Sequence, residues 1–233
     1  MISFEEFESN VSTIQERVAA ACKAAGRGVD SVQILPVTKT HPAEAVSYAA
    51  KLGFKSVGEN RVQEVQDKVD AALESSVVFE LIGHLQSNKA KQAVELCDRI
   101  QSVDSEKLMR RIDRLAEEIG KTQKILIQVN AGEDPAKFGI QCAELEPFME
   151  SALQLKNIQI EGLMTIAPLD EDIAVARKTF KRLRETRDSV STKWGIPLTE
   201  LSMGMTGDLE VAIAEGSTQI RVGSALYGAR NYQ

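Results

Sequence analysis

Apolar residues recur at spacings of three and four near the start of the chain, which predicts an amphipathic helix over residues 3–25. Ser3 and Glu6 have the spacing of a capping box at its start, and Gly26 is a typical residue to follow a helix end. One stripe of this helix should pack against the rest of the molecule. That stripe comprises Phe4, Phe7, Val11, Ile14, Val18 and Cys22.

After this helix, short apolar segments alternate with longer polar segments that have helical periodicity. The apolar segments are mostly continuous runs of Val, Ile and Leu, a pattern typical of parallel strands covered on both faces. We expect strands at 33–39, 56–59, 77–84, 99–103, 124–130, 159–166, 200–204 and 219–223. We expect helices at 43–52, 60–74, 87–96, 105–119, 142–155, 170–189 and 207–215.

Eight such strand–helix units predict an α/β protein with one domain over residues 1–233, a (β/α)8 TIM barrel with an extra N-terminal helix. The alternative is a doubly wound open sheet. That fold usually carries a GxGxxG motif after its first strand when it binds a dinucleotide, and no such motif follows residues 33–39.

Composition narrows the function classes. The chain has a net charge of −6 and three cysteines, Cys22, Cys97 and Cys142. The acidic balance argues against general nucleic-acid binding. The scattered cysteines argue against a disulfide framework or structural zinc and suit a reducing compartment. We find neither a signal-peptide pattern nor an apolar run of about 20 residues, so we expect a cytoplasmic protein that does not bind membranes.

Two glycine-containing segments suggest an anion site. The active site of a TIM barrel lies at the C-terminal ends of its strands, and phosphate often binds in the loops after strands seven and eight. In those loops lie "MGMTGD" (203–208), with Thr206, and "RVGSALYG" (221–228), with Gly223 and Ser224. Free N–H groups at a helix start and nearby hydroxyls bind phosphate well. The alternative is that these residues only cap two helices.

Lys39 closes the first predicted strand in "ILPVTKTHP" (34–42), where Pro42 prevents the strand from continuing. In a barrel its amine would point toward the mouth. Burial lowers the pKa of a lysine, and a neutral amine is a nucleophile toward carbonyls. Pyridoxal 5′-phosphate (PLP) carries both a carbonyl and a phosphate. The alternative is a strand-end lysine whose ammonium group extends into solvent.

Eight motifs, in order, resemble those of the pyridoxal phosphate homeostasis proteins (the YggS/PROSC group), whose fold is similar to the N-terminal barrel of alanine racemase. They are "VTKT" (37–40), "VGENRVQE" (57–64), "IGHLQSNK" (82–89), "SVDS" (102–105), "KFGI" (137–140), "GLMTIAP" (162–168), "LSMGMTGD" (201–208) and "GSTQIRVGSALYG" (216–228).

The resemblance implies a PLP site with a Schiff base on Lys39. It implies that Thr206, Gly223 and Ser224 hold the phosphate, that Arg221 faces the pyridine nitrogen, and that Asn60, His84 and Met203 line the cofactor. The chain departs from the family at Phe79-Glu80-Leu81, where Trp-His-Phe is usual, and at Thr206 and Ser224, where Ser and Thr are usual. Both hydroxyl exchanges keep a phosphate donor.

The resemblance also implies a non-catalytic protein that maintains vitamin B6 levels and supplies PLP to apo-enzymes, and we expect it to be a monomer. An arginine at the ring nitrogen would weaken carbanion stabilisation. Racemisation also needs an acid/base group on each face of the substrate. The chain ends at Gln233, where we expect no second domain to supply one. Two alternatives remain open: a PLP-dependent amino-acid racemase of narrow scope, and a sugar-phosphate enzyme that uses Lys39 as an aldolase does.

Overall fold

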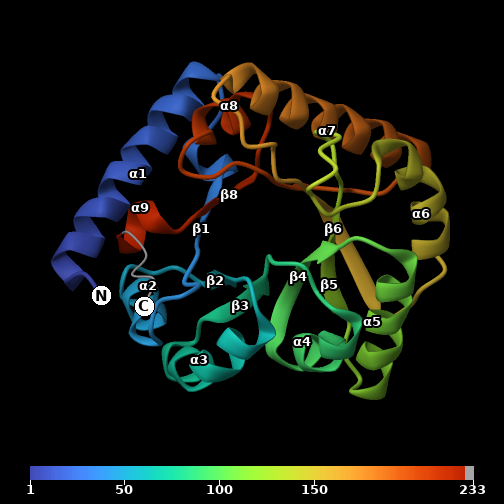
Figure 1. Cartoon of the computed structure of the whole chain (residues 1–233), viewed down its shortest axis with the longest axis horizontal. Helices are drawn as coiled ribbons and strands as arrows, with labels where there is room; N and C mark the ends of the chain where they lie inside the picture. Colours follow the sequence, from blue (N-terminus) through green and yellow to red (C-terminus); the bar gives the residue numbers. More distant parts are fainter. Residues whose placement is uncertain (229–233) are drawn as a thin grey trace.

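The computed structural model describes residues 1–228 and shows parallel strands around a central axis with helices outside them (Figure 1). The strands are β1 Gln33–Pro36, β2 Ser56–Glu59, β3 Val78–Leu81, β4 Cys97–Val103, β5 Gln123–Gln128, β6 Ile158–Met164, β7 Glu200–Ser202 and β8 Gln219–Val222. The α-helices are α1 Phe4–Ala24, α2 Glu44–Lys51, α3 Val62–Ser75, α4 Ala90–Leu96, α5 Glu106–Glu118, α6 Leu145–Ala152, α7 Ile173–Trp194, α8 Leu209–Ala214 and α9 Ser224–Tyr227. Short 3-10 turns lie at Val29–Ser31, Ser87–Lys89 and Cys142–Glu144.

The sheet order confirms the predicted barrel. Neighbouring strands run β1-β8-β7-β6-β5-β4-β3-β2, and every pair is parallel. Beyond the end of β1, Val37 forms a parallel bridge with Gly58 of β2, and the Thr38 N–H donates to the Gly58 carbonyl at 3.1 Å. The first strand and the second therefore meet, and the sheet closes on itself.

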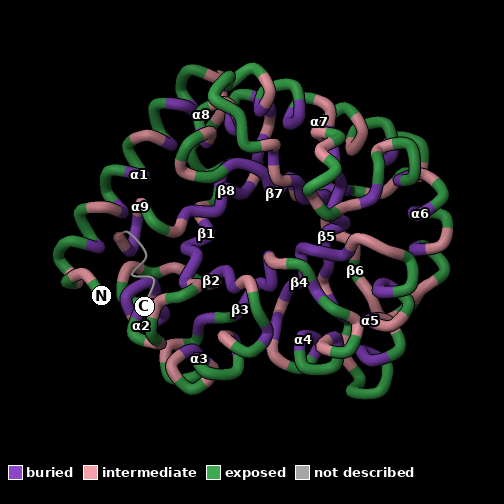
Figure 2. The backbone as a smooth tube through the Cα atoms, in the orientation of Figure 1, coloured by how far each residue is buried: buried purple, intermediate pink, exposed green. Residues whose placement is uncertain are grey.

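Burial follows the layers of the barrel. Buried residues concentrate along the strands and on the inner faces of the helices (Figure 2). The predicted stripe of α1 packs as expected, with Phe7 fully buried and Phe4 partly buried. Each buried side chain of that size contributes about 1.5–3 kcal/mol. Ser3 caps α1 by accepting the Glu6 N–H at 3.2 Å, so the extra N-terminal helix has a well-defined start and a strongly apolar contact face.

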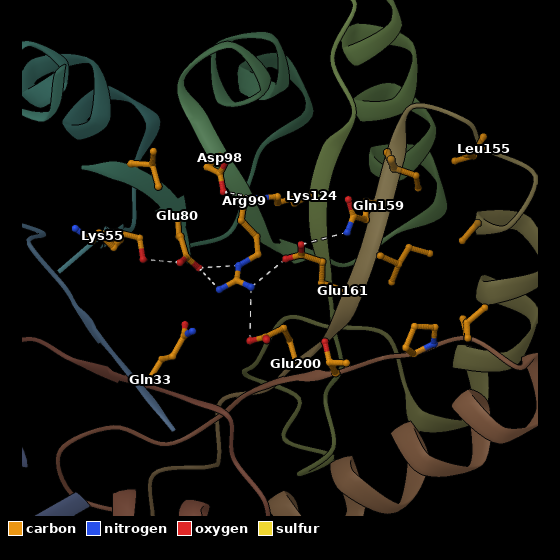
Figure 3. Close-up of a pocket in the computed structure, with 18 of the residues that line it drawn as sticks. Gln33, Lys55, Glu80, Asp98, Arg99, Lys124, Leu155, Gln159, Glu161 and Glu200 are labelled. Atoms are coloured by element: carbon orange, nitrogen blue, oxygen red, sulfur yellow. Dashed lines mark hydrogen bonds and ion pairs between the residues drawn. The ribbon is translucent and has the colours of Figure 1, made fainter. Parts of the chain in front are cut away.

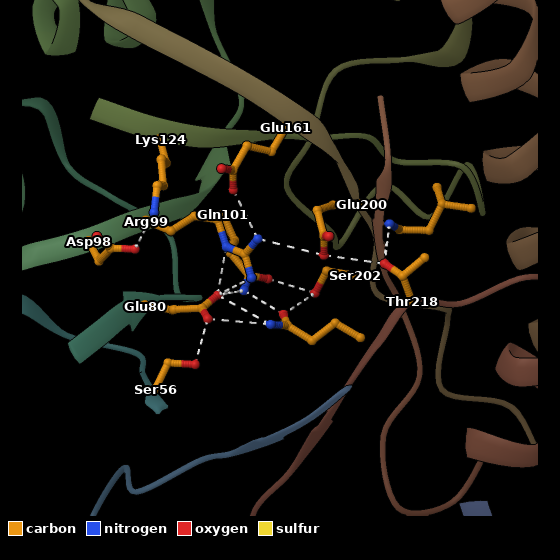
Figure 4. Close-up of polar contacts among 12 residues, drawn as sticks. Ser56, Glu80, Asp98, Arg99, Gln101, Lys124, Glu161, Glu200, Ser202 and Thr218 are labelled. Atoms are coloured by element: carbon orange, nitrogen blue, oxygen red, sulfur yellow. Dashed lines mark hydrogen bonds and ion pairs between the residues drawn. The ribbon is translucent and has the colours of Figure 1, made fainter. Parts of the chain in front are cut away.

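The middle of the barrel contains a polar network rather than only branched apolar side chains (Figure 4). Glu80 of β3 accepts hydrogen bonds from Arg99 at 2.7 and 2.8 Å and from Gln101 at 2.5 Å. Burial alone would lower the pKa of the Arg99 guanidinium, but Glu80 and its neighbours raise that pKa overall. Glu80, which departs from the family pattern, thus holds together the barrel interior.

A cavity of about 670 Å³ opens at the N-terminal ends of the strands (Figure 3). Most of its charged groups pair with one another: Arg99 lies 3.0 Å from Glu161 and 3.6 Å from Glu200, and Lys124 lies 3.1 Å from Asp98. Chemistry in this fold takes place at the other end of the barrel. We therefore regard this end as structural.

Within residues 1–228, no His, Cys, Asp and Glu side chains form a group of three or more that could hold a metal ion. None of the helices in that same range is long and apolar enough to cross a membrane.

Candidate functional site

A cavity of about 420 Å³ lies at the C-terminal ends of the strands, where the sequence predicted the site. It brings together Lys39, Asn60, His84, Thr206, Arg221, Gly223 and Ser224, seven of the eight predicted site residues. Met203 is not in the lining, because it is fully buried in the hydrophobic core. Met205, two residues later and partly exposed, lines the cavity instead.

The Lys39 side chain enters the cavity from a tight turn directly after β1. Lys39 is half-buried. The turn is closed by the His41 N–H, which donates to the Thr38 carbonyl at 3.1 Å. Thr40 has φ of 65°, a left-handed conformation that is rare for a β-branched residue. The chain thus reverses sharply and leaves Lys39 on the cavity wall.

Arg221 places a buried positive charge in the cavity wall without a directly bonded carboxylate. Its guanidinium donates to the Ser202 hydroxyl at 2.7 Å and to the Thr165 carbonyl at 2.8 Å. Burial lowers the pKa of Arg221 to about 10, although nearby Asp208 opposes this shift. Arg221 is therefore still a cation near neutral pH, and its contacts are neutral acceptors.

The network in the barrel interior fixes the orientation of these contacts. Because Arg221 only donates, Ser202 must accept from it, and the single Ser202 proton goes to the Gln101 amide oxygen at 2.6 Å. The Gln101 amide nitrogen then donates to the Glu80 carboxylate at 2.5 Å. A directional chain of hydrogen bonds therefore connects Arg221 at the cavity to Glu80 in the centre of the barrel, part of which is visible in Figure 4.

The loop between β7 and α8 forms one side of the cavity and is held from two directions. The Asp208 carboxylate accepts the Met205 N–H at 2.6 Å, and burial raises the pKa of that carboxyl group. From α1, Arg17 donates to the Thr206 carbonyl at 2.9 Å while it pairs with Glu210 at 2.8 Å. The N-terminal helix thus helps to position Thr206.

Glycines in these loops fall into two groups. Gly204 is needed by the fold, since its φ is 96° and an added Cβ would lie 2.5 Å from the Ala212 Cβ. Gly207 and Gly223 line the cavity but lack positive φ; an added Cβ at Gly207 would meet nothing within 4 Å, and one at Gly223 would come no closer than 3.4 Å to the Val37 carbonyl. At Gly207 neither chain packing nor a positive φ requires glycine, whereas the φ of −114° and ψ of −86° at Gly223 themselves favour glycine. Both positions leave the backbone accessible to a ligand in the cavity.

An aromatic pair covers another side of the cavity. His84 stacks on Phe138 with 3.9 Å between ring centroids and 10° between planes, and His84 Nδ1 lies 3.0 Å from an Asp104 oxygen. Phe138 is 55% exposed, so this apolar face is open to solvent at the rim. The Gln128 amide donates to the Phe138 carbonyl at 3.2 Å and ties this loop to the end of β5.

Sequence reasoning missed several lining residues. Gln128 carried a usable signal, because it is a polar residue at the end of an apolar strand. Phe138 lies in an irregular loop, where no periodicity indicates which side chains turn inward. The missed lining residues are Val37, Ile82, Gly83, Gln128, Phe138, Ile166 and Met205.

Comparison with known proteins identifies the family of this chain. The model of the alanine racemase N-terminal domain matches residues 2–231. A pyridoxal phosphate homeostasis protein of Aquifex aeolicus is 38% identical over 222 residues, which cover 95% of this chain and 97% of that protein. The chain belongs to the family of pyridoxal phosphate homeostasis proteins. The Escherichia coli protein of the same name is 31% identical over 226 residues, 96% of each chain.

Two solved structures agree with the fold. PipY of Synechococcus elongatus with PLP bound is 40% identical, with a TM-score of 0.81, covering 91% of this chain and all of that chain. Alanine racemase of Clostridium difficile is 13% identical with a TM-score of 0.80; the match covers 98% of this chain and 58% of the racemase, and it indicates the fold alone. The predicted family and the alanine racemase-like barrel are thereby confirmed.

Proposed function

We propose that this protein binds PLP covalently through Lys39 and acts as a non-catalytic carrier that maintains PLP supply. One observation carries the proposal: a single cavity collects the Lys39 amine, the buried Arg221 cation and the open wall formed by Gly207 and Gly223. The amine can react with the aldehyde of PLP, the cation can face its ring, and the accessible backbone can bind its phosphate. The PLP bound to the similar PipY supports the choice of ligand.

Each group has a distinct role in this proposal. The Thr206 and Ser224 hydroxyls would donate to the phosphate, together with N–H groups at the start of α9, because the first N–H groups of a helix have no acceptor within the helix. Arg221 would face the ring nitrogen, and Asn60 and His84 would border the ring, while Met203 lies in the core outside the cavity lining. PLP itself would supply the electrophilic aldehyde.

The covalent step needs no further reactant. In this proposal the neutral Lys39 amine would condense with the aldehyde that PLP supplies, and the aldehyde oxygen would leave as water with the two amine hydrogens. Hydrolysis reverses the step and releases PLP. The linkage therefore suits storage and delivery of a reactive aldehyde.

The lining supports a carrier rather than a catalyst. Among the described residues that line the cavity, Lys39, His84 and Arg221 are ionisable, and neither a tyrosine nor a carboxylate is present. A carboxylate at the ring nitrogen is the usual means of making PLP an electron sink. The homeostasis names of the relatives point the same way. We further propose a cytoplasmic monomer that hands PLP to apo-enzymes.

Absorbance spectroscopy and a transfer assay test this function. Purified protein mixed with PLP should develop visible absorbance that borohydride removes, and Lys39→Arg should not develop it. The loaded protein, mixed directly with a PLP-dependent apo-enzyme, should then reactivate that enzyme in proportion to the PLP that the loaded protein loses. Retention of PLP in the presence of excess apo-enzyme would contradict the carrier role. Exchange of the α-proton of an amino acid in deuterated water, lost in Lys39→Arg, would favour a racemase.

A further inference from the structure

Both peptide groups next to Lys39 are held by charged side chains that lie behind the cavity wall. The carbonyl of Thr38, in the peptide that precedes Lys39, accepts a hydrogen bond from the Lys68 ammonium at 2.8 Å. The N–H of Thr40, in the peptide that follows Lys39, donates to the Glu64 carboxylate at 2.6 Å. Lys68 and Glu64 both belong to α3, and their charged groups lie 3.6 Å apart.

The same cluster also fixes Thr38. Its hydroxyl donates to the Glu59 carboxylate at 2.6 Å, and that carboxylate accepts from Lys68, also at 2.6 Å. Thr38 and Glu59 are fully buried, and Lys68 is 4% exposed. With the Thr38 N–H bound to Gly58, every polar group of Thr38 has a partner at the seam where the barrel closes.

We infer that Glu64, with Lys68 and Glu59, positions Lys39 for bond formation by holding the two peptide planes on either side of it. Two fixed planes determine φ and ψ of the residue between them, so the direction of the Lys39 Cα–Cβ bond is fixed as well. The left-handed Thr40 marks the restraint, because a β-branched residue takes that conformation only when its surroundings impose it. Glu64 and Lys68 do not line the cavity and act through the backbone.

This inference rests on the proposed function and adds a prediction that the function alone does not make. The restraint acts on the amine end of the site, whereas phosphate binding depends on the loops after β7 and β8. Loss of the restraint should therefore slow reaction with the aldehyde without weakening phosphate-directed binding. Loss of a residue that only stabilises the fold would affect both the reaction with the aldehyde and the binding of the phosphate.

The test compares Glu64→Ala with Glu64→Gln, which keeps an oxygen that can accept the Thr40 N–H, and with Glu74→Ala, an exposed glutamate on the same helix. One measurement is the rate at which visible absorbance appears after mixing with PLP. The other is the dissociation constant of 4′-deoxypyridoxine 5′-phosphate, which lacks the aldehyde. Glu64→Ala should react about tenfold more slowly, since small errors in position cost large factors in rate, and its dissociation constant should change less than about twofold. The two control variants should match the wild-type protein.

Equal losses in both measurements, a wild-type rate in Glu64→Ala, or a slow rate in Glu64→Gln would each overturn the inference. Hydrogen exchange of the Thr40 amide provides a readout independent of PLP: it should be protected in the wild type and in Glu64→Gln and exposed in Glu64→Ala. Unchanged protection in Glu64→Ala would overturn the restraint even if PLP bound normally. If the wild type showed no absorbance with PLP, the proposed function would fail, while the exchange result would still decide whether Glu64 holds the turn.

Discussion

Replacement of Lys68 by methionine should destabilise the fold in a way that depends on pH. Lys68→Met keeps much of the apolar stem but removes the ammonium that bonds Glu59 at 2.6 Å and the Thr38 carbonyl at 2.8 Å. Glu59 is fully buried, and its second oxygen has no hydrogen-bond partner among the described residues. The variant would leave a carboxylate in the interior with only the Thr38 hydroxyl for compensation.

The magnitude follows from the cost of protonating Glu59. Burial already raises the pKa of this carboxyl group above its ordinary value of 4.5, while Lys68 and Thr38 oppose the shift. Without Lys68 the folded protein should bind a proton at Glu59. Near pH 7, roughly 2.5 pH units above the ordinary pKa, binding that proton costs about 3.4 kcal/mol, because each unit corresponds to about 1.36 kcal/mol. Breaking a buried ion pair commonly costs about 3–5 kcal/mol, in agreement with this value.

The sign of the pH dependence is opposite to ordinary acid denaturation. A carboxyl group with a raised folded-state pKa binds more protons in the folded state than in the unfolded state, so stability is lost as pH rises toward the folded-state pKa. The deficit of Lys68→Met relative to the wild type should therefore shrink by about 1.4 kcal/mol per pH unit as the pH falls toward 5.

Urea denaturation followed by the fluorescence of Trp194, the only tryptophan of the chain, measures these differences. The double variant Glu59→Gln with Lys68→Met removes the buried charge and should recover most of the loss near pH 7. A loss under about 1 kcal/mol at neutral pH, independent of pH, would refute the electrostatic reasoning. So would a double variant as unstable as Lys68→Met alone.

Ser202→Ala should lower the free energy of unfolding by about 2 kcal/mol, because it removes one of the two acceptors of the buried Arg221 guanidinium and leaves only the Thr165 carbonyl. Ser217→Ala, an equally buried serine whose hydroxyl bonds backbone carbonyls, should cost about 1 kcal/mol in the same urea titration; equal losses would contradict the role of Ser202. Iodoacetamide should label the native protein at Cys142 and spare Cys22 and Cys97, since both are buried and burial raises the pKa of Cys97 to about 12; peptide mapping of label on Cys97 in folded protein would count against the barrel packing.

Most of the fold could be predicted because its signals are local. Apolar runs marked all eight strands, and β2 matched its predicted range of 56–59. Several strands are shorter than predicted; β3 was expected over 77–84 but ends at Leu81, because apolar residues continue into a turn that the hydropathy pattern does not register. The four-residue α9 was expected only as a helical turn that starts at Ser224, because it is too short to show a helical period.

The site was less predictable because it depends on contacts between distant segments. Lys39 could be found from its place at the end of a strand. The contact of Ser202 with Arg221, and that of Glu64 with Thr40, join segments 19 and 24 residues apart, and no spacing rule links them. Met203 shows the same difficulty, because a resemblance between motifs did not reveal that this side chain packs in the core.

Borohydride reduction of PLP-loaded protein, followed by peptide mass mapping, tests the central claim most directly. If Lys39 carries the cofactor, the reduced pyridoxyl phosphate adduct should be found on the peptide that contains Lys39, at close to one adduct per chain. An adduct on any other lysine, or no adduct at all, would contradict the assignment of this cavity as a covalent PLP site.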